Sequence, residues 1–395
     1  MEILKILDVK DTCTGCGACV SICPKQALDL SYNEEGFYYP NLNENKCIYC
    51  KACEKVCHVI NHPISDKINR EYIPYMLKAS SPEIVAKSSS GGMFSLLANW
   101  VMERNGVVYG ARYNYEIERL EHCSTELCSL DELRKSKYIE SYMGTSFKLV
   151  ANDLKNNKYV LFCGTPCQIK GLKSYLDFRK ISQEKLVLAR FICHGVPSNS
   201  FFTEYKHWEE RRKKAKVTHI DFRPKTKGWR TSNLLMNFSN GKFLDELHNS
   251  NYYYYYFQHN YLLRSSCYKC KQIYEICGDF TIADFWGLNT FQPHNKENEG
   301  LSLVLVQTEK AIEILEDISK QCSILEKLPQ SAVDYIYKDT DWRKSCEEDR
   351  SSMIEQVQKY GYMKSVVRKV RKQVIKNKIH FYLANSKLWK IIRRK

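Results

Sequence analysis

Cysteine is the residue type in this sequence most able to do chemistry, and its positions are clustered. The chain has 395 residues and 18 cysteines. Eight of these form two runs of the pattern C-x-x-C-x-x-C-x-x-x-C: Cys13, Cys16, Cys19 and Cys23, then Cys47, Cys50, Cys53 and Cys57. A tight loop that supplies three thiolates, with a fourth from elsewhere, matches the corners of a cubane iron–sulfur cluster. Zinc sites favour two C-x-x-C arms joined by a longer loop, so the spacing indicates iron–sulfur binding.

The repeated run resembles a bacterial dicluster ferredoxin and predicts two [4Fe–4S] clusters. In such ferredoxins the last cysteine of each run binds the other cluster. We therefore predict one cluster on Cys13, Cys16, Cys19 and Cys57, and the other on Cys47, Cys50, Cys53 and Cys23. Pro24 follows Cys23 as in ferredoxins, whereas His58 follows Cys57, which changes the loop exit without removing a ligand. Such a domain carries single electrons, so a ferredoxin-like protein is an expected electron donor or acceptor.

Four further motifs occur in order along the chain. They are Gly164-Thr165-Pro166-Cys167-Gln168, Cys193-His194-Gly195, Cys267-x-x-Cys270, and Gly278-Asp279-Phe280-Thr281-Ile282-Ala283-Asp284-Phe285-Trp286-Gly287. With these motifs the chain resembles the coenzyme F420 hydrogenase/dehydrogenase beta-subunit family over roughly residues 75–345. Members fused to a dicluster ferredoxin occur in bacterial surface-polysaccharide gene clusters, so the resemblance suggests a role in that biosynthesis.

The resemblance implies a third [4Fe–4S] cluster. The matched motifs contain four cysteines that would bind it: Cys167, Cys193, Cys267 and Cys270. Cys167 and Cys193 each follow a predicted strand, so both can lie at one edge of a parallel sheet. Cys163 and Cys277 are near enough in the sequence to replace one of the four.

The resemblance also implies a non-covalent FAD, and the Ser/Gly-rich segment 87–92 is its expected phosphate site. This segment precedes a predicted helix, where backbone N–H groups favour an anion; taken alone, it is more often a simple helix cap. The residues expected to contact FAD are Lys87, Ser89, Ser90, Gly91 and Gly92, with weaker contacts from Lys137, Ser141 and Thr165. His194 either delivers a proton to substrate or flavin or fixes the local turn.

The elements that must position these residues follow an α/β pattern. Helical apolar spacing covers 93–103, 148–156 and 168–176, and strands are predicted at 106–110, 159–162 and 186–193. The later part reads as mixed α+β, with helices at 201–212 and 309–320 and strands at 217–222, 281–285 and 301–306. The tyrosine run 252–256 predicts a packed strand or helix rather than a stacking surface for substrate.

The expected fold class is therefore α/β and α+β multidomain. We divide the chain into a dicluster ferredoxin domain with two short strands (1–62), an FAD-binding region (72–198), a region with third-cluster ligands (199–345) and a basic helical tail (346–395). Residues 58–70 read as a polar linker.

The net charge of +15 is concentrated at the C-terminal end. Residues 364–395 contain twelve Lys or Arg and no Asp or Glu, which leaves +3 for the rest of the chain. The tail either binds an anionic membrane surface, docks on an acidic partner, or forms a solvated helical extension. No nucleic-acid-binding fold accompanies the charge. With no signal sequence and no long apolar run, we expect a soluble cytoplasmic protein, peripheral at the inner face of the membrane if the tail binds lipid.

The expected function is that of an iron–sulfur flavoprotein oxidoreductase. Electrons would pass between the clusters and FAD, and hydride transfer would link FAD to an organic substrate or a deazaflavin such as F420. The alternatives are a non-catalytic electron-transfer subunit of a larger redox complex and a cluster-stabilised scaffold.

Overall fold

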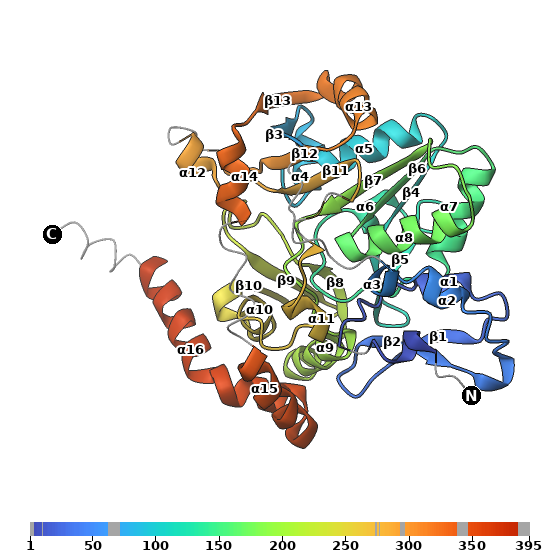
Figure 1. Cartoon of the computed structure of the whole chain (residues 1–395). Coiled ribbons are helices and arrows are strands. Elements are labelled where there is room, and N and C mark those ends of the chain that lie inside the picture. Colours follow the sequence, from blue (N-terminus) through green and yellow to red (C-terminus); the bar gives the residue numbers. More distant parts are fainter. Residues whose placement is uncertain are drawn as a thin grey trace.

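The computed structural model describes residues 4–9, 11–61, 72–272, 275, 277–292, 297–337 and 347–385. Its elements build a large central sheet, a small N-terminal unit on one flank and, below the sheet, a region of helices with a small three-stranded sheet (Figure 1). Most of the linker predicted over 58–70 and the end of the tail lie outside these residues. The first four of the residues read as linker form helix α3, His58–Asn61, and belong to the N-terminal unit, within the bounds 1–62 predicted for the ferredoxin domain.

The N-terminal unit, which we call the ferredoxin unit (residues 4–61), has the two strands that the sequence predicts. Strands β1 (Leu28–Tyr32) and β2 (Tyr38–Leu42) pair antiparallel. Each cysteine run forms a loop that ends in a short helix, α1 (Ala18–Ile22) or α2 (Ala52–Lys55). The loops repeat in backbone conformation as well: Gly15 and Gly17 have positive φ, and so do Tyr49 and Lys51. Both runs therefore wrap in the same left-handed turns.

The central sheet has eight strands in the order β13-β3-β12-β11-β7-β6-β4-β5. The four strands β11, β7, β6 and β4 are parallel, and the remaining pairs are antiparallel. The strands are β3 (Ile73–Ala79), β4 (Val107–Asn114), β5 (Arg119–Ser124), β6 (Val160–Gly164), β7 (Leu186–Phe191), β11 (Phe280–Asp284), β12 (Ser302–Val306) and β13 (Cys322–Lys327). Strands from both expected regions, 72–198 and 199–345, share this one sheet.

Helices cover both faces of the sheet. Helices α5 (Met93–Met102) and α13 (Glu309–Ser319) bury their apolar sides on one face, with α4 (Pro82–Ala86) beside β3. Helices α7 (Ser146–Lys155) and α8 (Pro166–Phe178) cover the other face. Their hydrophobic core continues into the ferredoxin unit through Ala18, Ile22 and Val56. The ferredoxin unit is therefore packed on α7 and α8, as Figure 1 shows.

The region below the sheet is held by an aromatic core. It contains a small antiparallel sheet of β8 (Val217–Asp221), β9 (Asn233–Phe238) and β10 (Phe243–Leu247), with helix α9 (Asn199–Lys213). The tyrosine run forms helix α10 (Tyr252–Gln258), in which Tyr253, Tyr254 and Tyr256 are buried. This confirms the prediction of a packed element. Helix α11 (Ser265–Tyr268) follows, and elsewhere in the chain stand the short helices α6 (Leu130–Leu133), α12 (Leu288–Phe291) and α14 (Gln330–Tyr337).

The part of the basic tail that the structure describes, residues 347–385, is helical, as predicted. It forms α15 (Glu347–Tyr360) and α16 (Tyr362–Asn385), and Val366, Val370 and Val374 of α16 are buried in the aromatic core. The mixed sheet and these helices confirm the predicted α/β and α+β class. Among the described residues, none of the helices combines the length and the apolar character needed to cross a bilayer.

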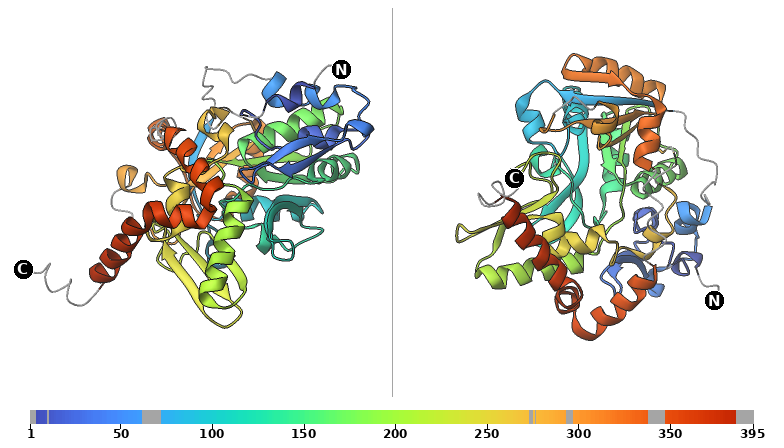
Figure 2. Two further views of the ribbon diagram at one scale, coloured as in Figure 1. Left: turned by 90° about the horizontal axis from the view of Figure 1, so that it is seen from below. Right: turned by 90° about the vertical axis from the view of Figure 1, so that its left-hand side faces the viewer.

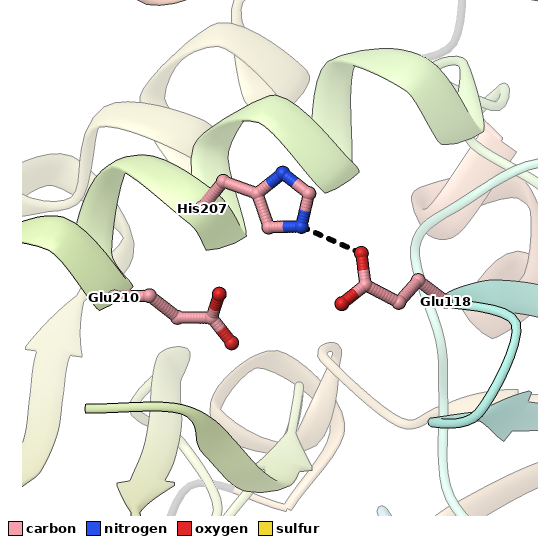
Figure 3. A group of neighbouring side chains, drawn as sticks. All are labelled: Glu118, His207 and Glu210. Carbon is pink, nitrogen blue, oxygen red and sulfur yellow. Dashed lines mark hydrogen bonds and ion pairs between the residues drawn. The ribbon is translucent and has the colours of Figure 1, made fainter.

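Three potential metal-binding side chains meet where α9 approaches the β4–β5 turn (Figure 3). Glu118 lies in the turn, and His207 and Glu210 lie on α9, with ligand atoms within 4.8 Å of one another. The buried Lys206 already pairs with both carboxylates, at 2.9 Å from Glu118 and 2.8 Å from Glu210. Burial alone would raise the pKa of both carboxyls. Hydrogen bonds and the charge of Lys206 outweigh it and hold both pKa values below the ordinary value of 4.5. This group is an ion-pair cluster that fixes α9.

We predict that Lys206→Met destabilises the fold by about 3 kcal/mol, because it leaves two partly buried carboxylates without their shared cation. The matched control is Lys216→Met, since Lys216 is 75% exposed and pairs with Glu210 at 3.3 Å. It should change the free energy of unfolding by less than about 1 kcal/mol. Denaturant unfolding of both variants and the wild type measures this difference.

The same cluster gives the stability a pH dependence. Because the folded-state pKa values of Glu118 and Glu210 are lowered, their contribution is present above pH 4.5 and is lost as the pH falls through the folded values. Lys206→Met should remove part of this acid sensitivity. Equal unfolding curves for the variant and the wild type at both pH 7 and pH 4 would show that the cluster contributes nothing.

Candidate functional site

The first three cysteines and Cys57 lie close to one another in the ferredoxin unit, on the side that packs on α8. Burial, followed by the charges of Cys57 and Cys13, raises the pKa of Cys16 to about 12. Burial also raises the pKa of Cys19 well above its ordinary value, and the charges of Cys16, Cys13 and Cys57 add to this. Thiols in this setting lose their protons only when a cation compensates them, as a metal does. The arrangement supports the predicted exchange of Cys57 into the first ligand set.

The second predicted ligand set shares a small cavity of its own. Cys23, Cys47, Cys50 and Cys53 all line this space of about 20 Å³. Backbone N–H groups point at two of the sulfurs: Ala27 donates to Cys23 at 3.2 Å and Tyr49 donates to Cys47 at 3.4 Å. Such N–H···S bonds stabilise thiolates bound to a cluster. Cys50 is exposed, so this set lies nearest to solvent.

A much larger cavity, of about 920 Å³, lies at the carboxyl ends of β6 and β7. Parallel sheets place ligand sites at this edge. The cavity brings together the four cysteines expected for a third cluster, namely Cys167, Cys193, Cys267 and Cys270. Burial raises the pKa of Cys167 well above its ordinary value, and the charges of Cys193, Cys270 and Cys267 add to this. Four thiols from three separate segments therefore converge on one wall.

The two alternative cysteines are placed differently. Cys163 lines the same cavity, and burial raises its pKa to about 12. Cys277 is buried behind the wall and is absent from the described lining. Its thiol donates to the Pro166 carbonyl oxygen at 3.8 Å, and its sulfur accepts from Arg190 at 3.8 Å. Of the two, only Cys163 is in the described lining of the cavity.

Most of the residues expected to contact FAD line the large cavity. Ser89, Ser90 and Gly92 do so at the start of α5, and Lys137, Ser141 and Thr165 line other parts of it. Lys87 is not in the described lining, because its ammonium pairs with Glu83 at 2.9 Å and with Asp131 at 3.0 Å. Its expected contact with FAD is not supported by this position.

Gly91 also stands outside the described lining and has a packing role. A side chain there would place its Cβ 2.1 Å from the Leu77 carbonyl oxygen and 2.7 Å from the Ser302 nitrogen. Its N–H donates to the Ser302 hydroxyl at 3.0 Å. Glycine is therefore required where the loop crosses β3 and β12, and this crossing presents Ser89, Ser90 and Gly92 to the cavity.

Hydrogen bonds fix the other polar side chains of the lining. Thr165 caps α8 by accepting from the Gln168 N–H at 3.4 Å, and the Thr165 hydroxyl lies 3.0 Å from the Cys167 sulfur. His122 contacts the Cys163 carbonyl oxygen at 3.2 Å and the Ser141 hydroxyl at 2.7 Å. Because the carbonyl only accepts, Nε2 of His122 carries the hydrogen and Ser141 donates to Nδ1. Burial lowers the pKa of His122 to about 4, so the ring stays neutral.

The cavity is electrostatically suited to an anion. The first turns of α5 and α8, helices of 10 and 13 residues, both line it. Their N–H groups and dipoles favour negative charge. Arg134, Lys137 and Arg223 also line it, although burial lowers the pKa of Lys137 to about 8. This combination fits a phosphate-bearing cofactor.

Several lining residues were missed by the sequence reasoning. His122, Phe257 and Arg264 lie in segments without a recognised motif. Only Arg264 carried a local signal, since it stands three residues before Cys267. His194, which the sequence did predict, lines the cavity, and its Nε2 donates to the Phe257 carbonyl oxygen at 3.3 Å.

Helix α8 connects the first cysteine loop to the cavity. A Cβ added to Gly171 would lie 2.8 Å from the Cys16 sulfur and 3.0 Å from its Cβ. Gly171 and Cys167 are four residues apart, so they lie on the same side of α8, one turn from each other. A cysteine of the first ligand set is therefore within about one helical turn of a cysteine of the cavity.

Fold and site together define an iron–sulfur protein of the α/β class, in which a dicluster unit is packed beside a cofactor-sized cavity. Residues 12–60 match the 4Fe-4S dicluster domain. Residues 157–331 match the family model for the C terminus of the coenzyme F420 hydrogenase/dehydrogenase beta subunit. The chain thus joins a 4Fe–4S dicluster domain to a domain of that oxidoreductase family, which confirms the predicted resemblance.

Two individual relatives agree with the dicluster part of this assignment. Ferredoxin-3 of Nostoc sp. is 34% identical over 62 residues, covering 12% of this chain and 64% of the relative. An uncharacterized polyferredoxin-like protein of Methanocaldococcus jannaschii is 28% identical over 79 residues, covering 16% of this chain and 47% of the relative. The chain thus spans less than two thirds of either relative. A chain of the F420-reducing [NiFe] hydrogenase complex of Methanosarcina barkeri superposes with a TM-score of 0.47 and 14% identity, covering 74% of this chain and 94% of that chain.

We predict that Gly171→Ala disturbs the first ligand set specifically, because its Cβ would overlap the Cys16 sulfur. The purified variant should lose about four of its irons, the content of one cluster. Ser174→Ala, on the same helix, is the control and should retain full iron content. A fully loaded Gly171→Ala protein with an unchanged cluster spectrum would contradict the close packing of Cys16 on α8.

Proposed function

We propose that this chain is an iron–sulfur flavoprotein oxidoreductase that passes electrons between ferredoxin-type clusters and FAD. Hydride transfer would connect FAD to an organic substrate or to a deazaflavin such as F420. Clusters exchange single electrons, whereas a bound flavin exchanges electrons in pairs with organic molecules. The observation that carries the proposal is the shared cavity, which is lined by four cysteines and an anion-binding wall. One of these cysteines, Cys167, lies about one turn along α8 from Gly171, which contacts Cys16.

The residues present fit an FAD. A volume of about 920 Å³ lies in the range of sites for large ligands. Ser89, Ser90 and Gly92 would bind phosphate oxygens at the start of α5, with Lys137 as a nearby cation. The rings of Tyr138 and Phe257 stack with their centroids 4.9 Å apart and give the lining an apolar face that excludes water. Ser141 and Thr165 would contribute hydroxyls to the same lining.

The four cavity cysteines would hold the third [4Fe–4S] cluster. They come from the start of α8, the segment after β7 and the α11 region, so the ligand set forms only in the folded core. His194 follows one of these cysteines and is our proposed proton donor to substrate. Its hydrogen bond to the Phe257 carbonyl holds the ring at the cavity wall. The substrate class suggested by the resemblance is an intermediate of surface-polysaccharide biosynthesis.

A non-catalytic electron-transfer subunit is the second candidate function. The observation that favours it is the surface around the second ligand set, where Cys50 and Ile48 are exposed beside Lys25 and Lys46. A partner redox protein with an acidic face would fit this surface. Turnover of a small molecule by the purified protein with an artificial electron donor would favour the enzyme over the electron-transfer role.

The decisive measurement is the cofactor content of protein purified without oxygen. About twelve irons and one FAD per chain are expected, since each [4Fe–4S] cluster holds four irons. Iron, acid-labile sulfide and released flavin would be measured on one sample. About eight irons without flavin would leave the dicluster unit as the sole redox site and overturn the flavoprotein proposal.

We predict that Cys270→Ala lowers the iron content from about twelve toward eight per chain, because one ligand of the third cluster is lost. Cys322→Ala is the matched control, since Cys322 is half-buried and its thiol donates to the Ile318 carbonyl oxygen at 3.5 Å. It should keep all its iron. Unchanged iron in Cys270→Ala would refute the assignment of this cysteine.

We also propose that the basic tail binds an anionic membrane surface, which would place the protein at the inner face of the membrane. Toward its end α16 runs out from the body (Figure 2). Ile375, Ile379 and Leu383 recur every four residues there and are 41%, 53% and 51% exposed. Arg371, Lys372 and Lys376 are exposed beside them. Apolar residues on one stripe with flanking cations are typical of helices that lie on anionic lipid.

For this tail we predict that replacing Ile375, Ile379 and Leu383 with Gln abolishes flotation with vesicles of anionic phospholipid. The apolar stripe would no longer enter the lipid, although the attraction of about 1 kcal/mol per basic residue would remain. The control variant replaces Ile117 and Leu127 with Gln, since both are exposed outside α16. Equal flotation of all three proteins, or none by the wild type, would exclude membrane binding by this stripe.

A further inference from the structure

Arg264 is a buried arginine that connects the ferredoxin unit to the wall of the cavity. Its side chain is 1% exposed, and it lines the cavity just before α11. Its Nε donates to the Cys13 carbonyl oxygen at 2.7 Å, and a terminal nitrogen donates to the Tyr38 carbonyl oxygen at 2.9 Å. The guanidinium also lies 4.1 Å from the ring centre of Tyr39. One side chain from the core thus binds both the first cysteine loop and strand β2.

Glu140 completes this contact from the other side. Its carboxylate pairs with the Arg264 guanidinium and accepts from the Tyr38 N–H at 3.0 Å. Gly15 of the first cysteine loop lies against the pair, since a Cβ there would be 2.8 Å from Glu140 Oε1 and 3.0 Å from Arg264. The absence of a side chain at Gly15 therefore allows the loop to approach the buried pair.

The charge of Arg264 acts on cysteines of two different ligand sets. Although burial opposes its ionisation, Glu140 and then Cys13, Tyr39 and Cys267 hold the pKa of Arg264 above its ordinary value. Cys13 belongs to the first dicluster ligand set, and Cys267 belongs to the proposed third. Reduction adds a negative charge to a cluster, and a fixed cation in a buried setting stabilises that charge.

We propose that Arg264 is a positioning residue that fixes the ferredoxin unit against the cavity and whose charge raises the redox potentials of the iron–sulfur sites on both of its sides. Glu140 opposes this effect, so the pair sets the two potentials together. The part that concerns Cys267 rests on the proposed third cluster. The part that concerns Cys13 needs only the dicluster domain.

The test is a redox titration of the full chain, purified without oxygen and followed by electron paramagnetic resonance, with iron measured on each sample. Arg264→Gln removes the cation and should shift the affected cluster potentials downward. Glu140→Gln leaves the cation without its counter-charge and should shift them upward. Arg350→Gln is the control, because Arg350 also joins the ferredoxin unit to the core, pairing with Glu35 and donating to the Leu263 carbonyl oxygen at 3.1 Å.

Opposite shifts in the first two variants, with Arg350→Gln unchanged, would support the proposal. A fully loaded Arg264→Gln protein with wild-type potentials would overturn it. If Arg264→Gln also loses iron, two other results decide. Full iron content in both Arg264→Lys and Arg350→Gln would support the positioning role of Arg264. Unchanged cluster potentials in Glu140→Gln would refute its electrostatic role. Iron loss from Arg350→Gln as well would show that the whole contact, and not Arg264 in particular, is required. Eight irons in the wild-type protein would contradict the third cluster of the proposed function. The potential of the cluster bound by Cys13 could still be titrated, so the part of the proposal that concerns Cys13 would remain testable.

Discussion

The loop that carries Cys13, Cys16 and Cys19 packs directly on α8, with no side chain at Gly171 to separate them. Two other features depend on this contact. The apolar core under α7 and α8 continues into the ferredoxin unit, so the unit shares the core instead of being tethered by a linker alone. The start of the same helix supplies Cys167 to the cavity, so one element fixes both the packing of the ferredoxin unit and the position of a cavity cysteine.

Two buried charged side chains, Arg264 and Glu140, bridge this apolar contact, and both need their partners to stay there. Arg264 and Glu140 are both buried, and each is satisfied by partners on either side of the boundary. Removing one member of such a pair leaves an uncompensated charge, which is costly in a buried setting. The boundary therefore tolerates little relative movement, and the distance between the two cysteine-bearing parts is set by packing and hydrogen bonding at once.

Much of this arrangement could be predicted from the sequence, because cysteine runs, helices and strands each leave a pattern within a short segment. Cysteine spacing identified both runs, and helical or strand periodicity identified α5, α8, β6 and β7 to within a few residues. The insertion of β3 between β12 and β13 joins residues more than 200 positions apart and leaves no local pattern. Gly91 read as a phosphate-loop glycine, although its need for glycine comes from β3 and β12. Arg264 resembled any arginine before a cysteine pair, since its partners lie in the ferredoxin unit.

The position of β3 has a consequence for the order of events during synthesis. β3 follows the ferredoxin unit in sequence, yet both of its sheet neighbours come from residues 302–327. Helix α8 ends at Phe178, and the 149 residues from there to Lys327 take roughly 7–30 s to translate. During that interval the first cysteine loop already has its packing partner on the ribosome, while β3 has neither neighbour. Metal loading of the N-terminal cysteines can therefore precede closure of the sheet.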